Sequence, residues 1–178
     1  MVGCVVSRRE TAKGFSADEG FIENRTRMKD DPPMTAPKLK VLFLCTGNSC
    51  RCQMADGWAH HLKSDCLEPY SAGIEKHGLN PTAVKVMQEA GVDITSQKSN
   101  TVDELGPVEF DVVVTVCGHA DENCPAFHGA PRVVHVGFDD PPRLAKAAAT
   151  EEEALGHYRR VCDEIHKFVE TLPAAIAQ

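Results

Sequence analysis

A run of apolar residues that ends on a cysteine, followed by small and polar residues and an arginine, constrains this chain more than any other feature. Val41 to Leu44 form the continuous apolar pattern of a strand buried in a parallel sheet. Cys45 follows directly, Arg51 closes the short loop, and residues 53–59 are helix-like. Small residues let the loop curl so that its N–H groups point inward, and the start of a helix adds partial positive charge. The sequence therefore predicts a cradle for an oxyanion.

This predicted cradle has a sulfur nucleophile at its floor. The field of the loop amides and the helix start favours Cys45 as a thiolate near neutral pH. Arg51 offers a planar fork of donors that suits a tetrahedral oxyanion. A buried strand-end cysteine beside a surface arginine is the alternative, and the strand–loop–helix context argues against it. The residues expected to bind the anion are Thr46, Gly47, Asn48, Ser49, Cys50, Arg51 and Cys52.

Composition limits the classes of protein to consider. The chain has 178 residues, which is enough for one domain with a core, and a formal net charge of -7, which argues against general nucleic-acid binding. No apolar run approaches the roughly 20 residues of a membrane helix. The chain has 8 cysteines but no recognisable signal peptide, so we expect a cytoplasmic protein whose cysteines serve thiol chemistry or metal binding rather than a disulfide framework.

The chain divides into two parts of different character. Residues 1–37 mix charges of both signs with Gly, Ser and Thr and show no sustained period, so we expect a disordered amino-terminal extension. From residue 38 to 178, strand-like and helix-like segments alternate, which predicts a single domain with an open α/β sheet. The predicted strands are residues 41–44, 70–74, 112–116 and 133–136, and the main predicted helices are residues 50–64, residues 81–90 after an Asn80 cap, and the segment that follows Thr150.

A second cluster of thiols follows the third predicted strand. Cys117 and Cys124 lie in a polar, glycine-containing segment that we interpret as a loop. Because the carboxyl ends of parallel strands meet at one edge of the sheet, we expect Cys117 to come near Cys45. Two thiols on a loop beside a thiolate can pass oxidation outward by successive exchange. A zinc site formed by Cys117, His119 and Cys124 is the alternative, but a fourth ligand is not evident.

A pair of acidic residues lies in a third segment, before Pro141. A carboxylic acid on a loop near the cradle can protonate a departing oxygen. On its own, however, the Asp139-Asp140-Pro141 sequence indicates only a turn.

Taken together, these segments resemble the thioredoxin-coupled arsenate reductases, which are built on the low-molecular-weight tyrosine phosphatase fold. The match rests on Cys-Thr-Gly-Asn-Ser-Cys-Arg at residues 45–51 and the following Gln-Met-Ala, on Tyr-Ser-Ala-Gly-Ile-Glu at 70–75, on Val-Thr-Val-Cys at 114–117 with Cys124, and on Gly-Phe-Asp-Asp-Pro at 137–141. The resemblance implies a three-layer α/β sandwich around a central four-stranded parallel sheet.

The resemblance also implies a division of roles. Cys45 would attack arsenate, with Arg51 and the loop amides holding the oxyanion and Asp140 protonating the leaving hydroxide. Cys117 would attack Cys45 and release arsenite, and Cys124 would attack Cys117 in turn. Thioredoxin would reduce the final disulfide, so no bound cofactor is expected. The expected partners are arsenate and thioredoxin, with neither nucleic acid nor membrane, and we expect a monomer.

Two departures from the family pattern bear on the chemistry. Cys52 stands where the family usually has serine or threonine, whose hydroxyl bonds the thiolate, and a thiol is a weaker donor. We therefore predict a less stabilised Cys45 thiolate or an off-pathway disulfide. Some members bind potassium, and Asn48 and Ser71 match that site, but Asp56 and Asn100 differ from it, so we expect no metal.

Two other functions remain open at this stage. A tyrosine phosphatase would use Cys45, Arg51 and Asp140 without a relay, but Pro142 and Arg143 stand where phosphatases of this fold usually place tyrosines. Weak phosphatase side activity is compatible with the cradle. A non-enzymatic sensor of arsenite or metal would bind its ligand through thiols and show no turnover.

Overall fold

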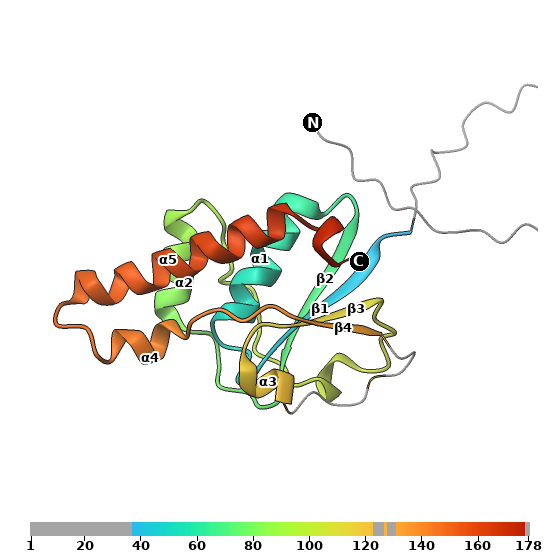
Figure 1. The fold of residues 1–178 in the computed structure, drawn as a ribbon, viewed down its shortest axis with the longest axis horizontal. Helices are drawn as coiled ribbons and strands as arrows, with labels where there is room; N and C mark the ends of the chain where they lie inside the picture. Colours follow the sequence, from blue (N-terminus) through green and yellow to red (C-terminus); the bar gives the residue numbers. More distant parts are fainter. Residues whose placement is uncertain (1–36, 123–126, 128–130, 177–178) are drawn as a thin grey trace, which may run out of the picture.

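The computed structural model describes residues 37–122, 127 and 131–176 (Figure 1). Residues 1–36 of the predicted extension lie outside these described residues, as does Cys124. Within the described residues, no helix is both long enough and apolar enough to span a bilayer.

A sheet of four parallel strands forms the centre of the fold, as the sequence predicted. The spatial order of the strands is β2-β1-β3-β4. The central strands are buried on both faces, which is why their sequences are continuous apolar runs. The strands are β1 (Leu39–Cys45), β2 (Leu67–Gly73), β3 (Val112–Thr115) and β4 (Arg132–His135).

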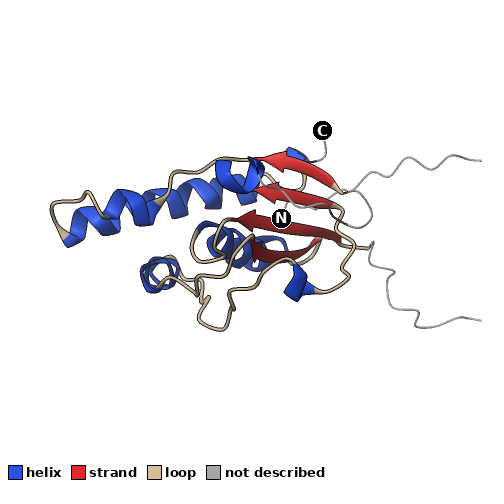
Figure 2. Ribbon diagram, turned by 90° about the horizontal axis from the view of Figure 1, so that it is seen from below, coloured by secondary structure: helices blue, strands red, loops and turns tan. Residues whose placement is uncertain are grey.

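Helices cover both faces of this sheet, giving three layers. Figure 1 shows α1 and α5 on one side of the sheet and the short α3 on the other, while Figure 2 shows the strands side by side in the sheet. The α-helices are α1 (Arg51–Lys63), α2 (Pro81–Glu89), α3 (Gly118–Glu122), α4 (Pro141–Ala145) and α5 (Glu151–Glu170), and two 3-10 turns are η1 (Asp103–Leu105) and η2 (Ala174–Ile176).

The longest helix follows its predicted pattern. Thr150 caps α5, and its side chain accepts a hydrogen bond from the N–H of Glu153 at 3.1 Å. The carboxylate of Glu153 in turn accepts from the N–H of Ala149, one residue earlier than an ideal capping box. The apolar residues that recur at three- and four-residue steps face the core, which includes Leu155, Tyr158, Cys162 and Ile165.

Three local assignments differ from the sequence prediction. β2 begins at Leu67 rather than at residue 70 and includes Pro69. β2 lies at the edge of the sheet, where one side of a strand has no partner strand, so a proline that lacks an N–H on that side breaks no hydrogen bond of the sheet. The polar segment after β3, predicted as a loop, contains the short helix α3. The acidic turn continues into α4, with Pro141 at its first position.

The capping role of Asn80 at the start of α2 can be tested by substitution. The side chain of Asn80 accepts hydrogen bonds from the N–H groups of Thr82 and Ala83, at 2.9 and 3.0 Å. We expect Asn80→Ala to lower the free energy of unfolding by about 1–2 kcal/mol, measured by denaturant titration. Tyr158→Phe is the control, because it removes only the hydroxyl that accepts from Asn80 Nδ2. Equal losses in the two variants would contradict the capping role.

Candidate active site

The loop between β1 and α1 turns its carbonyl groups outward. The carbonyl oxygens of Cys45, Thr46, Gly47 and Ser49 accept hydrogen bonds of 2.8–3.1 Å from N–H groups of the segment 74–80, which follows β2. A loop whose carbonyl oxygens all bond to the surrounding chain is held in one shape. Its N–H groups are then directed to the other side, toward the space that the loop encloses.

The N–H groups of this loop remain available to a ligand. Within the described part of the chain, no acceptor takes a hydrogen bond from the backbone N–H of residues 46–50. Helix α1 begins at Arg51 with no side-chain cap. Asn48 has a φ of 43°, in the left-handed region that asparagine tolerates better than most residues. Free N–H groups at an uncapped helix start are able to bind an anion, and oxyanion binding at these residues stays a prediction.

Asn48 also braces the loop from within. Its side-chain oxygen accepts hydrogen bonds from Gln53 Nε2 at 2.8 Å and from the N–H of Asn100 at 2.7 Å, and its Nδ2 donates to Cys52 Sγ at 3.3 Å. The end of β2 approaches so closely that a Cβ on Gly73 would lie 2.7 Å from the Asn48 nitrogen. The glycine of the Ser-Ala-Gly motif is therefore required for this packing.

Arg51 connects the cradle to the acidic segment, as expected of a shared site. Its Nη2 lies 3.0 Å from Asp140 Oδ1, and its Nη1 donates to the carbonyl oxygen of Phe138 at 3.0 Å. Asp140 precedes α4, but its side chain caps no N–H group of that helix. Its carboxylate is directed to Arg51 instead, which places an acidic group at the mouth of the cradle.

These groups line one cavity of about 310 Å³. Cys45 lies at its floor and is 4% exposed. His77 also lines the cavity, and the sequence analysis did not identify it. The sequence indicates this position of His77 only indirectly. The segment that follows β2 leaves the sheet at the same edge as the loop that follows β1. The lining residues are Cys45, Thr46, Gly47, Ser49, Cys50, Arg51, His77, Asp140 and Pro142.

The second thiol of the loop differs from Cys45. Burial raises the pKa of Cys50 to about 12, although the nearby Arg51 guanidinium acts in the opposite direction. Cys50 is therefore a neutral thiol at neutral pH and a poor nucleophile.

Cys117 reaches the loop from the neighbouring strand. β1 and β3 are adjacent and parallel, and the N–H of Val116 donates to the Leu44 carbonyl at 2.9 Å. The Cys117 sulfur is a free thiol 3.4 Å from Thr46 Oγ1, the side chain next to Cys45. The expected approach of Cys117 to the cradle is thus present.

The remaining members of the thiol cluster cannot be placed in the same way. Cys124 lies outside the described residues, and the structure does not describe the side chain of His119. Both the relay and the zinc alternative for this cluster therefore remain predictions. Within the described residues, no group of three or more His, Cys, Asp or Glu side chains is arranged to hold a metal ion.

Cys52 contacts the nucleophile directly. The structure pairs the sulfurs of Cys45 and Cys52 in a disulfide, with their Cα atoms 5.9 Å apart. Cys52 is fully buried in the first turn of α1. The residue that replaces the family's usual hydroxyl is therefore close enough to react with Cys45.

Several of the oxygen atoms considered for potassium are bonded to protein groups, but Asp56 Oδ1 is buried without a hydrogen-bond partner. Ser71 Oγ donates to Asp56 Oδ2 at 2.9 Å, and His60 Nε2 lies 3.4 Å from Asp56 Oδ1. Burial raises the pKa of Asp56, which further weakens it as an anionic ligand. The oxygen of Asn48 already accepts from Gln53 and Asn100. Potassium binding at these residues stays a doubtful prediction, and no chemical step is assigned to it.

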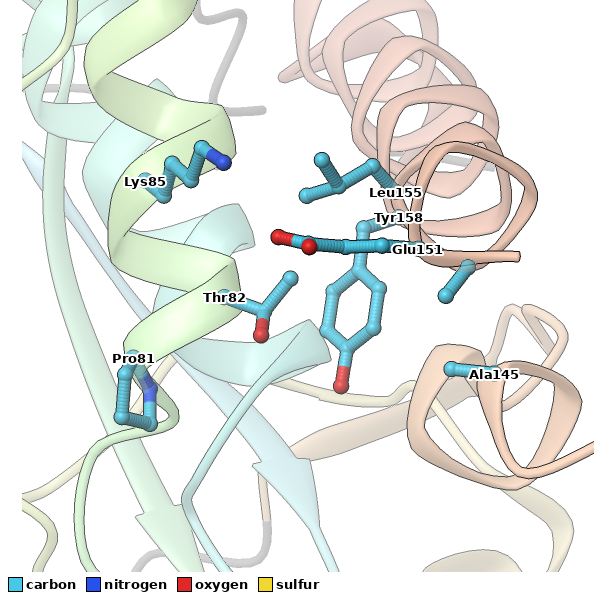
Figure 3. A pocket seen from close by; sticks show the side chains of 8 residues that line it. Pro81, Thr82, Lys85, Ala145, Glu151, Leu155 and Tyr158 are labelled. Carbon is cyan, nitrogen blue, oxygen red and sulfur yellow. The ribbon is translucent and has the colours of Figure 1, made fainter. Parts of the chain in front are cut away.

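A second cavity, of about 270 Å³, lies between α2 and α5 (Figure 3). Figure 3 shows Lys85 and Glu151 facing it from the two helices, with Tyr158 between them. Its lining contains neither a thiol nor an arginine. Two hydrogen bonds link its lining residue Tyr158 to the loop. The Tyr158 hydroxyl accepts from Asn80 Nδ2, and the Asn80 N–H donates to the carbonyl oxygen of Ser49. The lining of this cavity has no thiol nucleophile for the chemistry expected at the loop.

Replacing Cys52 with serine tests how the nucleophile is stabilised. In the reduced protein, we expect Cys52→Ser to lower the pKa of Cys45, because a hydroxyl donates a stronger hydrogen bond to a thiolate than a thiol does. The pH dependence of alkylation at Cys45, followed by mass spectrometry, measures this. Cys162→Ala, which removes a buried thiol on α5, should leave the titration unchanged. An unchanged pKa in Cys52→Ser would refute the expectation.

The chain belongs to the low molecular weight phosphotyrosine protein phosphatase family, whose sequence pattern it matches over residues 40–178. Among its relatives, an arsenate reductase of Halalkalibacterium halodurans is 52% identical over 134 residues, which cover 75% of this chain and 94% of that protein. An arsenate reductase of Bacillus subtilis is 51% identical over 125 residues, covering 70% and 88% of the two chains.

A solved structure shows the same fold. It is described as an arsenate reductase in the phosphate binding state and superposes with a TM-score of 0.61 at 30% sequence identity, covering 78% of this chain and 99% of that one. The α/β sandwich with four parallel strands predicted from the sequence is therefore confirmed.

Proposed function

We propose that this protein reduces arsenate to arsenite with three cysteines in sequence, Cys45, Cys117 and Cys124. The observation that carries the proposal is the position of the free Cys117 thiol against Thr46, at the edge of an oxyanion cradle whose floor is Cys45. A phosphatase of this fold needs the cradle but has no use for a second thiol at its edge. The arsenate reductases among the relatives support the same reaction.

The first step is capture and attack. The N–H groups of the loop and the Arg51 guanidinium bind the arsenate oxygens, and the Cys45 thiolate attacks arsenic. A sulfur–arsenic bond forms while one arsenic–oxygen bond breaks. Asp140, held beside Arg51, gives the departing hydroxide its proton, so that it leaves as water.

The next steps transfer electrons from thiols to arsenic, and no further arsenic–oxygen bond breaks. The Cys117 thiolate attacks the Cys45 sulfur, and the electron pair of the sulfur–arsenic bond goes to arsenic, which passes from the +5 to the +3 state and leaves as arsenite. Cys124 then attacks Cys117 and releases the Cys45 thiolate. The resulting disulfide between Cys117 and Cys124 is the form that needs an external reductant.

A thioredoxin-type dithiol protein would supply the reducing equivalents. Cys45 and Cys117 are both almost completely buried, so we expect the partner to attack the final disulfide at Cys124. No bound redox cofactor is needed, because two thiols supply the two electrons. The proposed setting is the cytoplasm, where thiols are kept reduced.

The experiment is a coupled assay of the purified protein with thioredoxin, thioredoxin reductase and NADPH. Arsenate-dependent NADPH consumption that requires thioredoxin is the expected result. Hydrolysis of an aryl phosphate is measured in parallel, because a weak phosphatase activity is compatible with the same cradle. Stable arsenite binding without turnover would instead identify a sensor. Absence of arsenate-dependent consumption would overturn the proposal.

The acidic pair before α4 offers a matched test of the acid. We expect Asp140→Asn to lower kcat for arsenate reduction by about 10²–10³-fold, because it removes the proton donor and the carboxylate that holds Arg51. Asp139→Asn is the control, since Asp139 lies on the surface and its carboxylate bonds to Arg160 at 2.8 Å. Similar losses in both variants would show that Asp140 has no special role.

A further inference from the structure

Cys52 is the thiol that contacts Cys45 directly. It is fully buried and does not line the oxyanion cavity, whereas Cys45 does. The two sulfurs are paired in the structure, and their Cα separation of 5.9 Å lies within the usual range for a disulfide. Cys45 therefore borders the oxyanion cavity and contacts the Cys52 sulfur as well.

A resolving thiol must come within bonding reach of the Cys45 sulfur. Cys52 meets this requirement, because the two sulfurs are paired in the structure. Cys117 also approaches, but its sulfur contacts Thr46 rather than Cys45 itself.

A hydrogen-bond donor and a helix start both face the sulfur of Cys52. Asn48 Nδ2 donates a hydrogen bond to its sulfur at 3.3 Å, and Cys52 lies in the first turn of α1, where the helix dipole favours negative charge. Asn48 is in turn fixed by Gln53 and Asn100. The donor that faces Cys52 is thus held in place by the loop itself.

We propose that Cys52 is a resolving thiol for the arsenic adduct on Cys45, a role that rests on the proposed arsenate reduction. The Cys52 thiolate attacks the Cys45 sulfur, forming the Cys45–Cys52 disulfide. The sulfur–arsenic bond breaks, its electron pair goes to arsenic, and arsenite leaves with arsenic in the +3 state. The proton of the Cys52 thiol passes to the departing arsenite.

Cys117 remains necessary after this step. The Cys45–Cys52 disulfide is buried, so a partner protein cannot reach it. Cys117 attacks the Cys45 sulfur of that disulfide and releases Cys52 as a thiolate, which returns the enzyme to the relay through Cys124. Cys52 therefore accelerates arsenite release without replacing the outward relay.

The test is one anaerobic turnover by the fully reduced Cys117→Ser variant without thioredoxin. We expect about one arsenite per protein, because two thiols supply two electrons, and a Cys45–Cys52 disulfide in peptide mass spectra. Adding Cys52→Ser should abolish both. Adding Cys162→Ser instead should change neither, since Cys162 is a buried thiol on α5 that does not line the oxyanion cavity. Phosphate in place of arsenate should give no disulfide.

The outcomes separate this inference from the proposed function. If wild type releases arsenite but Cys117→Ser retains arsenic on Cys45, Cys52 is not a resolving thiol and the proposed function stands. A Cys45–Cys52 disulfide that forms equally with phosphate would also overturn the inference, because its oxidant would not be arsenate. If wild type releases no arsenite, the proposed function fails and the inference fails with it.

Discussion

Cys45→Ser is expected to abolish arsenate reduction, with a loss of roughly 10⁴-fold or more in kcat/KM. A serine hydroxyl in the same cradle stays protonated near neutral pH and is a far weaker nucleophile than a thiolate. It also cannot take part in thiol exchange, so the electrons of Cys117 would have no route to arsenic. The measurement is arsenate-dependent NADPH consumption, together with arsenic content by mass spectrometry of the intact protein, which should show no adduct.

Cys50→Ser is the matched control for this variant. Cys50 lies in the same loop and lines the same cavity, but burial raises its pKa to about 12. We expect activity within a few fold of wild type, because a thiol that stays protonated adds nothing as a nucleophile. Loss of activity in Cys50→Ser with retention in Cys45→Ser would reverse the assignment of the nucleophile.

Cys117→Ala and Cys124→Ala are expected to stop sustained turnover, with steady-state rates falling by about 10³-fold or more. Without Cys117, no thiol can pass the oxidising equivalents from Cys45 to Cys124. Without Cys124, the protein should accumulate a disulfide between Cys45 and Cys117. Both variants should still form the first adduct with arsenic, which separates a loss of the relay from a loss of binding.

The two relay variants also distinguish the reductase from a phosphatase. Hydrolysis of an aryl phosphate needs Cys45, Arg51 and Asp140 only, so any such activity should survive both substitutions. Cys162→Ala is the control for the removal of a buried thiol, because Cys162 packs on α5 against Met87, outside the oxyanion cavity. Sustained arsenate turnover in either relay variant would show that the electrons take another route.

Much of the fold could be predicted from the sequence because its signals are local. Apolar runs mark β1 and β3, Asn80 and Thr150 mark helix starts, and the repeat of apolar residues marks α5. The start of β2 was missed, because a proline disfavours a strand unless the strand lies at an edge. Which strand lies at an edge is decided by the order of the sheet, which no local pattern gives.

The site could be predicted in outline but not in its contacts. The motif places Cys45 and Arg51 in one loop, and the parallel sheet brings Cys117 to the same edge. The sequence does not show that Arg51 bonds to Asp140 or that His77 lines the cavity, because these contacts join segments far apart in the chain. Cys52 was noticed as a departure from the family pattern, but its pairing with Cys45 required the structure.

The central claim is that arsenic receives its two electrons from thiols of this chain, and one anaerobic turnover of the reduced wild-type protein without thioredoxin tests it directly. Arsenite and free thiols are counted together, and disulfides are mapped by mass spectrometry. The account predicts about one arsenite per protein, the loss of about two thiols, and a disulfide between Cys117 and Cys124. Arsenate processed with no loss of thiols, or a protein that leaves arsenate unchanged, would contradict it.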